Sequence, residues 1–239
     1  MAGQNYYLIT SLPPLGELGT APPLGLADLL AHVRDSAGPG TLVQIVLLGD
    51  DLLQRQAYLA GEIKEVAPAV LTAGQVRNEE PLPDDLAGPE QPPSPLADTD
   101  AVWANYFRRA AEMAARRRSG FLAAWTGYEV AMRNALAAER AKALGLEAEQ
   151  YMVAADLGRT DANFEALLSE WAAAADPLAG LRVLDRARWA WISEHDAWFS
   201  FADDEVAAYA ARLVLLHRWH RLSQAVQARQ GGQAGAEAC

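Results

Sequence analysis

A cluster of prolines near the middle of the chain places the strongest limit on its fold. Six of the 13 prolines fall between Pro81 and Pro95, in the acidic stretch EEPLPDDLAGPEQPPSP. Proline has no backbone N–H and fixes φ, so this stretch is incompatible with a long helix or a central strand. We therefore predict an extended linker at residues 79–97. It divides the 239-residue chain into a small helical N-terminal part at residues 1–78 and a long-helix bundle at residues 98–239.

The second part carries a strong helical pattern. From residue 102 to residue 136, apolar side chains recur at helical spacing with a break at Ser119-Gly120, and the pattern ends at Leu144-Gly145. It predicts a helix or helix pair of about 45 residues, roughly 65 Å long if continuous. Three later start signals predict the remaining helices, the last two of which should pack antiparallel. These signals are Thr160 or Asp161, Asp176-Pro177 and Asp203-Asp204.

The first part is less uniform. Residues 26–33 have helical spacing, and we expect the following Gly38-Pro39-Gly40 to end that helix. The next stretches, TLVQIVLLG and DDLLQRQAYLAGEI, predict two short helices with Asp50 or Asp51 capping the second. A buried strand at Leu42–Leu48 stays open as the alternative, because periodicity does not separate the two structures over so short a run.

The N-terminal segment NYYLITSLPPLG, residues 5–16, differs from the rest because it is rich in β-favouring residues and stops at Pro13-Pro14. In an extended conformation both of its faces would carry apolar side chains. We predict a strap at residues 5–15, buried in a groove against the C-terminal part, with Leu42–Leu48 as its candidate pairing partner. The predicted fold class is therefore all-α, a bundle of long helices with a short extended N-terminal segment.

Charge is unevenly distributed along the chain. Residues 1–100 hold 14 acidic and four basic residues, whereas the remainder holds 17 acidic and 16 basic residues, and the formal net charge is −11. An acidic chain is repelled by nucleic acid and by anionic membrane surfaces, so we expect no nucleic-acid partner. The longest apolar run is far shorter than the roughly 20 residues of a membrane-spanning helix, so we expect no direct membrane span. The N-terminus also lacks the pattern of a secretory signal, and we expect a cytoplasmic protein.

Recognisable reactive motifs are missing. The sequence has no phosphate-binding glycine loop, no nucleophile elbow and no zinc-protease motif. His217 and His220 are three residues apart but have no carboxylate near them in sequence, so a core or interface role is favoured over a metal site. Cys239 is the single cysteine, which excludes an internal disulfide and a multi-thiolate zinc site. We expect no catalytic residue, cofactor or metal.

Two polar clusters remain as candidate interaction or helix-seam residues. In TGYEVAMRNALAAERA, Glu129 and Arg133 are spaced to pair along one helix, where the pair would stabilise it by only about 0.3–0.5 kcal/mol, or else to act across a helix–helix seam. Asn134 and Arg140 lie on neighbouring faces. A second cluster consists of five arginines, whose expected counterpart is an acidic protein surface or the chain's own acidic linker. These are Arg108, Arg109, Arg116, Arg117 and Arg118.

Four stretches together resemble an uncharacterised bacterial family that is encoded beside the subunits of V/A-type rotary ATPases. This family is itself similar to a shortened relative of the C/d-type component of the central stalk of those ATPases. The stretches follow one another in order over most of the chain. They are YYLITSLPPL at Tyr6–Leu15, YEVAMRNALAAERAKALG at Tyr128–Gly145, DPLAGLRVLDRARW at Asp176–Trp189 and FADDEVAAYAARLVLLHRW at Phe201–Trp219.

The resemblance implies an all-helical, non-catalytic coupling subunit seated between the membrane ring and the rotating stalk of an ATPase that transports protons or sodium ions. Its partners would be other protein subunits, and it would be held at the periphery of the inner membrane through that complex. The fuller stalk component is longer and built from repeated helical units, and no clear repeat is found here. Two alternatives stay open: a free-standing helical adaptor that binds another, basic protein, and an enzyme with an unrecognised site.

Overall fold

The structure is a computed structural model that describes residues 5–87 and 95–236, with side chains described in residues 5–87 and 99–224. Its described part consists of helices and connecting loops without any strand, which confirms the predicted all-α fold. The helices are α1 (Tyr6–Ser11), α2 (Leu26–Val33), α3 (Ala37–Leu59), α4 (Ala73–Arg77), α5 (Asp84–Ala87), α6 (Pro95–Arg117), α7 (Gly120–Leu144), α8 (Glu165–Ala172), α9 (Pro177–His195) and α10 (Asp203–Ala236), with short 3-10 turns at Ala148–Tyr151 and Ala155–Leu157.

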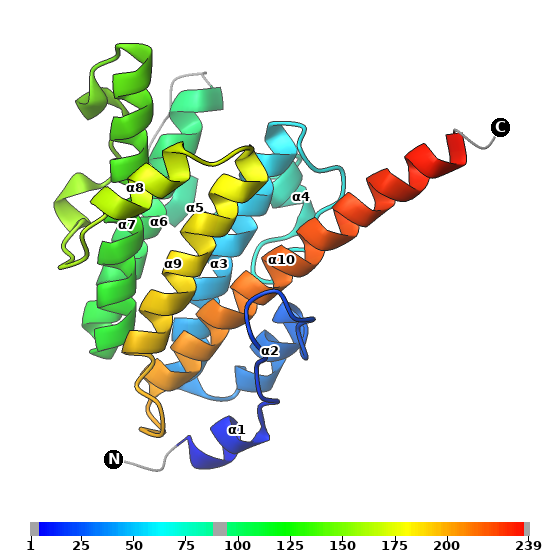
Figure 1. Cartoon of the computed structure of the whole chain (residues 1–239). Helices are drawn as coiled ribbons and strands as arrows, with labels where there is room; N and C mark the ends of the chain where they lie inside the picture. The colour runs from blue at the N-terminus through cyan, green and yellow to red at the C-terminus, as the bar shows by residue number, and fades with distance from the viewer. Residues whose placement is uncertain (1–4, 88–94, 237–239) are drawn as a thin grey trace.

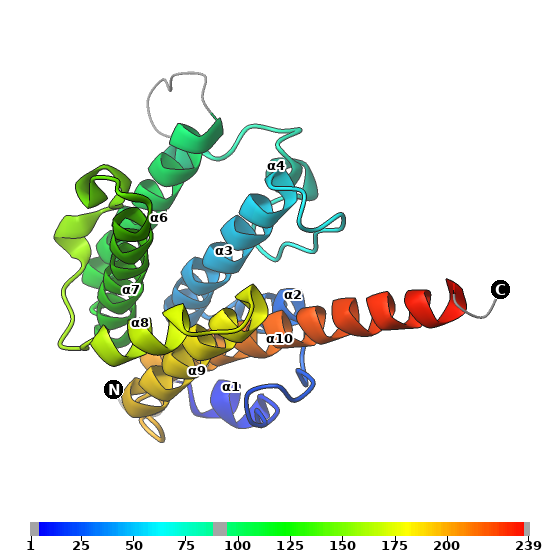
Figure 2. The ribbon, with the colours of Figure 1, turned by 45° about the horizontal axis from the view of Figure 1, so that its top comes forward.

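The long helices form the frame of the molecule (Figure 1). Figure 2 shows α6 and α7 side by side on the left and α3 next to them, with α9 and α10 running across the lower part of the view. Helix α10 packs along α3 and against α9, and its C-terminal half extends away from the bundle. No helix in the described ranges is both long enough and apolar enough to cross a bilayer.

One apolar core contains residues from both predicted parts of the chain. Helix α3 contributes the fully buried Leu42, Leu47 and Leu48, and α10 contributes Leu213 and Leu215 to the same cluster. The predicted boundary at residues 79–97 therefore does not separate two cores.

The predicted linker is also partly helical. Residues 84–87 form α5, whose Leu86 is fully buried, and helix α6 already begins at Pro95. Proline is tolerated in the first turn of a helix because the N–H groups there have no helical acceptor. Residues 88–94 of the predicted linker lie outside the described residues.

The extended conformation predicted for the N-terminal strap was wrong at residues 6–11, although Leu8, Ile9, Leu12 and Leu15 are partly buried against the core. Residues 6–11 form helix α1, in which the hydroxyls of Thr10 and Ser11 donate to the carbonyls of Tyr6 and Leu8 at 2.7 Å. Hydroxyl-to-backbone bonds of this kind offer the chain an alternative to the sheet ladder that β propensity predicts. The helix contains no buried residue, and its proposed pairing partner, Leu42–Leu48, lies inside α3.

The two short helices predicted for residues 41–63 are one continuous helix, α3, which ends at Leu59. Gly38-Pro39-Gly40 was expected to stop a helix but lies in the first turn of α3, where Pro39 removes no helical hydrogen bond. Asp50 and Asp51 are buried in the middle of α3, so they bind neighbouring segments rather than capping a helix.

Most local start and stop signals later in the chain act as predicted, but the helix expected to start at Thr160 or Asp161 begins only at Glu165. Ser119 separates α6 from α7, and its hydroxyl caps α7 by accepting from the Leu122 N–H at 3.0 Å. Asp176 caps α9 through the Ala179 N–H at 2.7 Å, with a proline in the first turn, and α10 starts at Asp203.

Candidate functional site

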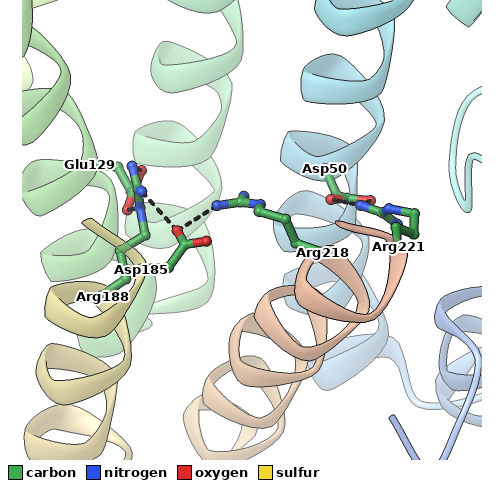
Figure 3. Close-up of polar contacts among 6 residues, drawn as sticks. All are labelled: Asp50, Glu129, Asp185, Arg188, Arg218 and Arg221. Carbon is green, nitrogen blue, oxygen red and sulfur yellow. Dashed lines mark hydrogen bonds and ion pairs between the residues drawn. The ribbon is translucent and has the colours of Figure 1, made fainter. Parts of the chain in front are cut away.

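A cluster of charged side chains with little exposure lies where α7, α9 and α10 come together (Figure 3). Arg188 of α9 forms a two-pronged contact with Glu129 of α7, with Nε–Oε1 and Nη2–Oε2 distances of 2.7 and 3.1 Å. The remaining nitrogen of the same guanidinium, Nη1, donates to Asp185 Oδ1 at 3.1 Å. Burial alone would lower the pKa of Arg188, but Glu129 and Asp185 outweigh it and raise the pKa above the ordinary arginine value. Arg188 therefore remains cationic.

Asp185 links this contact to the third helix. Its side chain is 0% exposed, and Oδ1 also accepts from Nη1 of Arg218 in α10 at 2.7 Å. The charges alternate in sign across the three helices, from Glu129 to Arg188, Asp185 and Arg218. We call these four residues the seam network. Asp185 Oδ2 is buried without a hydrogen-bond partner in the structure.

A second pair connects α10 to α3 next to the seam network (Figure 3). Arg221 Nη2 donates to both carboxylate oxygens of Asp50, at 2.8 and 3.1 Å. Asp50 is almost fully buried, and its Oδ2 also accepts from Gln54 Nε2 at 2.9 Å. Helix α10 is thus connected by ion pairs to α9 on one side and to α3 on the other.

A cavity lies between these two groups of ion pairs. Its volume is about 70 Å³, room for a few water molecules and well below the roughly 300–1,000 Å³ of sites for drug-sized ligands. Aromatic side chains of α6 and α7 line it together with charged groups of the two ion-pair clusters. The main lining residues are Trp103, Tyr106, Phe107, Trp125, Glu129, Arg188, Arg218 and Asp50.

The predicted cluster on α7 acts across helices. Glu129 binds Arg188 instead of the residue one turn away, Arg133. Arg133 instead lies 3.6 Å from Asp100 of α6 and stacks over the Trp103 ring at 4.7 Å. Burial lowers the pKa of Arg133, and Asp100 partly offsets that effect.

The other two candidates on α7 hold neighbouring segments. The buried side chain of Asn134 accepts from the Val153 N–H at 2.8 Å and donates to the Val153 carbonyl at 3.0 Å, which fixes the loop that follows α7. The Arg140 guanidinium lies over the Trp171 ring of α8 at 5.3 Å. The four residues thus contact different partners and do not form one site.

The five arginines of the second cluster are also dispersed. Arg109 pairs with Asp85 of α5 at 2.6 Å, inside the acidic segment expected as a counterpart, while Arg108 is exposed. Arg116, Arg117 and Arg118 lie together at the turn between α6 and α7 and are all exposed.

At that turn, Arg116 pairs with Glu112 at 2.5 Å, and Arg117 donates to the Thr41 hydroxyl at 3.0 Å. Arg118 has a positive φ of 54°. The next residue closes the turn, since the Ser119 N–H donates to the Ala114 carbonyl at 2.9 Å.

The histidine pair does not converge on one ligand. His217 Nε2 is 2.7 Å from the Leu24 carbonyl oxygen, and burial lowers its pKa. His220 instead contacts Gln224. In the part of the chain that the structure describes, no three histidine, cysteine or acidic side chains are placed to hold a metal ion. Cys239 lies outside the described residues.

Sequence reasoning missed three of the four residues of the seam network. Asp185 and Arg188 are separated by one helical turn, and Arg218 lies outside the apolar stripe of α10, so each could have been read as a surface charge. No local pattern shows that they meet, because 30 residues or more separate α7, α9 and α10 at these contacts.

The geometry of the seam network is suited to holding helices together. Asp185 Oδ1 already accepts from two guanidiniums, and all three nitrogens of Arg188 donate to carboxylates. Such paired charges fix the relative positions of the helices, since a shift of one helix would leave a buried charge unpaired. Comparison with protein-family models, with curated proteins and with solved structures gave no match to this chain.

Proposed function

We propose that this chain is a non-catalytic structural subunit that couples other protein subunits, as part of a V/A-type rotary ATPase or accessory to it. The first support is the order of the four stretches that resemble the ATPase-associated family. Three of them supply the seam network: the second contains Glu129, the third contains Asp185 and Arg188, and the fourth contains Arg218. Residues from separate stretches of the resemblance thus meet at one place in the fold.

The observation that carries the proposal is the position of Asp185 between two helices. A subunit that transmits torque has to keep its helices in register under load. Close apolar packing makes the interior resist compression. Asp185 is fully buried and bound by Arg188 on its own helix and Arg218 on α10, so sliding of α10 along α9 breaks a desolvated ion pair.

The proposal is tested by purification from native membranes. The chain is expressed with an affinity tag in its own organism, membranes are solubilised mildly, and co-purifying proteins are identified by mass spectrometry. Stalk or ring subunits of the ATPase should be recovered with the tagged chain and not with an unrelated tagged protein. Recovery of a different, basic protein without ATPase subunits would contradict the proposal and favour the free-standing adaptor.

A further inference from the structure

Aromatic side chains gather at the end of the bundle where α1 meets the loop between α9 and α10 (Figure 1). Ring centroids are 5.2 Å apart for Tyr6 and Phe201, 6.3 Å for Phe199 and Phe201, and 5.0 Å for Trp198 and Phe199. The exposed fractions are 86% for Tyr7, 68% for Trp198 and 69% for Phe199. We call these five residues the aromatic end. A group of large exposed rings is typical of a surface that binds another molecule.

The loop that carries Trp198 and Phe199 is held in one conformation by α10. Ala197, Phe199 and Phe201 have positive φ angles of 51°, 60° and 52°. Residues with side chains rarely adopt this region, and where they do, the surrounding structure has to hold them. Here the carboxylate of Glu205 accepts from the N–H groups of Phe199 and Phe201 at 3.2 and 2.7 Å. Glu205 thus fixes the loop through two neutral donors and keeps its negative charge.

Two other carboxylates in the first turn of α10 also keep their negative charge beside the aromatic end. Asp203 accepts from the Asn5 side chain at 2.7 Å. Asp204 accepts from the Ser119 hydroxyl and from the Phe121 N–H, the latter at 3.1 Å. All of these donors are neutral, so none of them cancels a charge.

The nearby charges sum to an excess of negative charge. With the exposed Glu194 in the last turn of α9, four carboxylates have no cationic partner among the described residues. The exposed Arg117 and Arg118 of the α6–α7 turn oppose two of them, which leaves an excess of two negative charges. The helix dipoles do not change this balance, because α6 and α9 end here while α7 and α10 begin here. Other charges at this end offset one another: Arg116 with Glu112, Arg212 with Asp196, and Arg34 with its neighbour Asp35.

We propose that the aromatic end and its four carboxylates form the docking surface for another protein, whose contacting segment is basic and carries exposed arginine or lysine side chains. Guanidinium and ammonium groups bind the faces of aromatic rings and also pair with carboxylates, so this surface offers them both kinds of contact. The net charge of −11 adds a long-range attraction for a basic protein. The same charge repels nucleic acid and anionic membranes. The inference rests on the proposed function only in that the chain works through protein contacts.

A photo-cross-linking residue at position 7 tests the surface in the full chain. Tyr7 is replaced by benzoylphenylalanine, which leaves Trp198 and Phe199 in place, the cells are irradiated, and the cross-linked peptide is sequenced. The control carries the same group at Leu144, which is 72% exposed at the other end of α7. We expect position 7 to capture a segment of another protein in which lysine and arginine outnumber aspartate and glutamate, with a yield at least about tenfold above that at position 144. Capture of a segment without this basic excess, of lipid or of a second copy of this chain, or a yield equal to the control, overturns the inference.

Two variants of the chain with the cross-linker at position 7 test the two kinds of contact separately. Glu194→Lys should lower the yield at least about threefold, because it reverses one exposed charge of the surface. Trp198→Ala should lower it at least about tenfold, because it removes an exposed ring. Both side chains are exposed, so the melting temperature should stay the same.

The matched controls lie at the far end of α7 and in the 3-10 turn after it. Glu147→Lys and Tyr151→Ala make the same kinds of change at exposed positions away from the aromatic end, and both should leave the yield unchanged. A yield that does not fall in Glu194→Lys or in Trp198→Ala, or that falls as much in the controls, overturns the inference.

The cross-linking separates this inference from the proposed function. Capture of a basic segment from a protein outside the ATPase, without co-purifying ATPase subunits, supports the docking surface and contradicts the ATPase assignment. Co-purification of ATPase subunits with no cross-link at position 7 above the control contradicts the docking surface alone.

Discussion

Arg218 of α10 donates a hydrogen bond of 2.7 Å to Asp185 of α9, and the Asp185 side chain is 0% exposed. The two residues are 33 positions apart in sequence. Their contact joins the seam network to the helix that also binds α3 through Arg221 and Asp50. Stability and coupling should therefore both depend on this buried carboxylate.

Replacing Asp185 by alanine should strongly destabilise the fold. The change leaves the guanidiniums of Arg188 and Arg218 without one of their acceptors in a desolvated region. Breaking a buried pair in this way costs about 3–5 kcal/mol. The measurement is chemical denaturation of the wild type and the variant.

Arg186→Ala, one residue along the same helix, is the matched control. Its pair with Glu170 is exposed on both sides, so its loss should change the free energy of unfolding by about 0–1 kcal/mol. Equal effects for the two variants would show that Asp185 has no special structural role.

The carboxyl of Asp51 should make stability depend on pH in an unusual direction. Burial raises its pKa from 3.8 to about 6, although the N–H groups of Leu71, Ala69 and Val70 partly offset this effect. The folded chain therefore binds this proton more tightly than the unfolded chain. The contribution of Asp51 to stability is complete below the unfolded pKa and is lost as the pH rises through about 6.

Denaturation of the wild type and Asp51→Asn across this pH range measures that contribution. The free energy of unfolding of the wild type, relative to the variant, should fall by about 3 kcal/mol from well below pH 3.8 to well above pH 6. Carbon NMR of the Asp51 carboxyl should show the same titration. A midpoint below the ordinary aspartate value would refute the prediction and show that the three backbone donors outweigh burial.

Asn134→Ala should loosen the loop after α7. It leaves the buried N–H and carbonyl of Val153 without the side-chain partner that they have in the structure, at a cost of about 2–4 kcal/mol. Amide hydrogen exchange should accelerate first in residues 148–157. The exposed Asn163, which accepts from the Glu165 N–H, is the control, and its replacement by alanine should have a small effect. Unchanged exchange in the loop would contradict the role of Asn134.

Arg118→Gly should stabilise the chain. Arg118 follows the last residue of α6 with a φ of 54°, a position at which helices favour glycine. Glycine should raise the free energy of unfolding by about 1 kcal/mol. Arg116→Gly, inside the last turn of α6, should lower it by about 0.5–1 kcal/mol, because glycine is unfavourable within a helix. Thermal unfolding of both variants checks the opposite signs, and equal signs would contradict the account.

Helix starts and stops could be predicted from the sequence where they act locally. Asp176-Pro177 and Ser119 supply a cap within three residues of the group they bind, so no knowledge of the fold is needed. The helix end predicted at Gly38-Pro39-Gly40 was wrong because the same tripeptide is compatible both with the end of a helix and with the first turn of one. Packing of α3 against α10 favours the first turn of a helix at this position, and the sequence alone does not show that packing.

The candidate site could be predicted only in part. Glu129 was identified as a candidate from its pattern, but Arg133 one turn away and Arg188 in α9 are equally suitable partners by charge. The tertiary fold decides between them, since Arg188 lies 59 residues away in sequence. The exposed rings of Trp198 and Phe199 follow from backbone angles that the composition of the loop does not indicate.

The central claim is tested most directly by measuring ATP hydrolysis and ATP-driven ion uptake in membrane vesicles from cells with and without this gene. If the chain is a coupling subunit, vesicles without it should keep much of their ATP hydrolysis but take up fewer ions per ATP hydrolysed. A plasmid-borne copy of the gene should restore the ion uptake. Ion uptake per ATP that is the same in both kinds of vesicle would contradict the account.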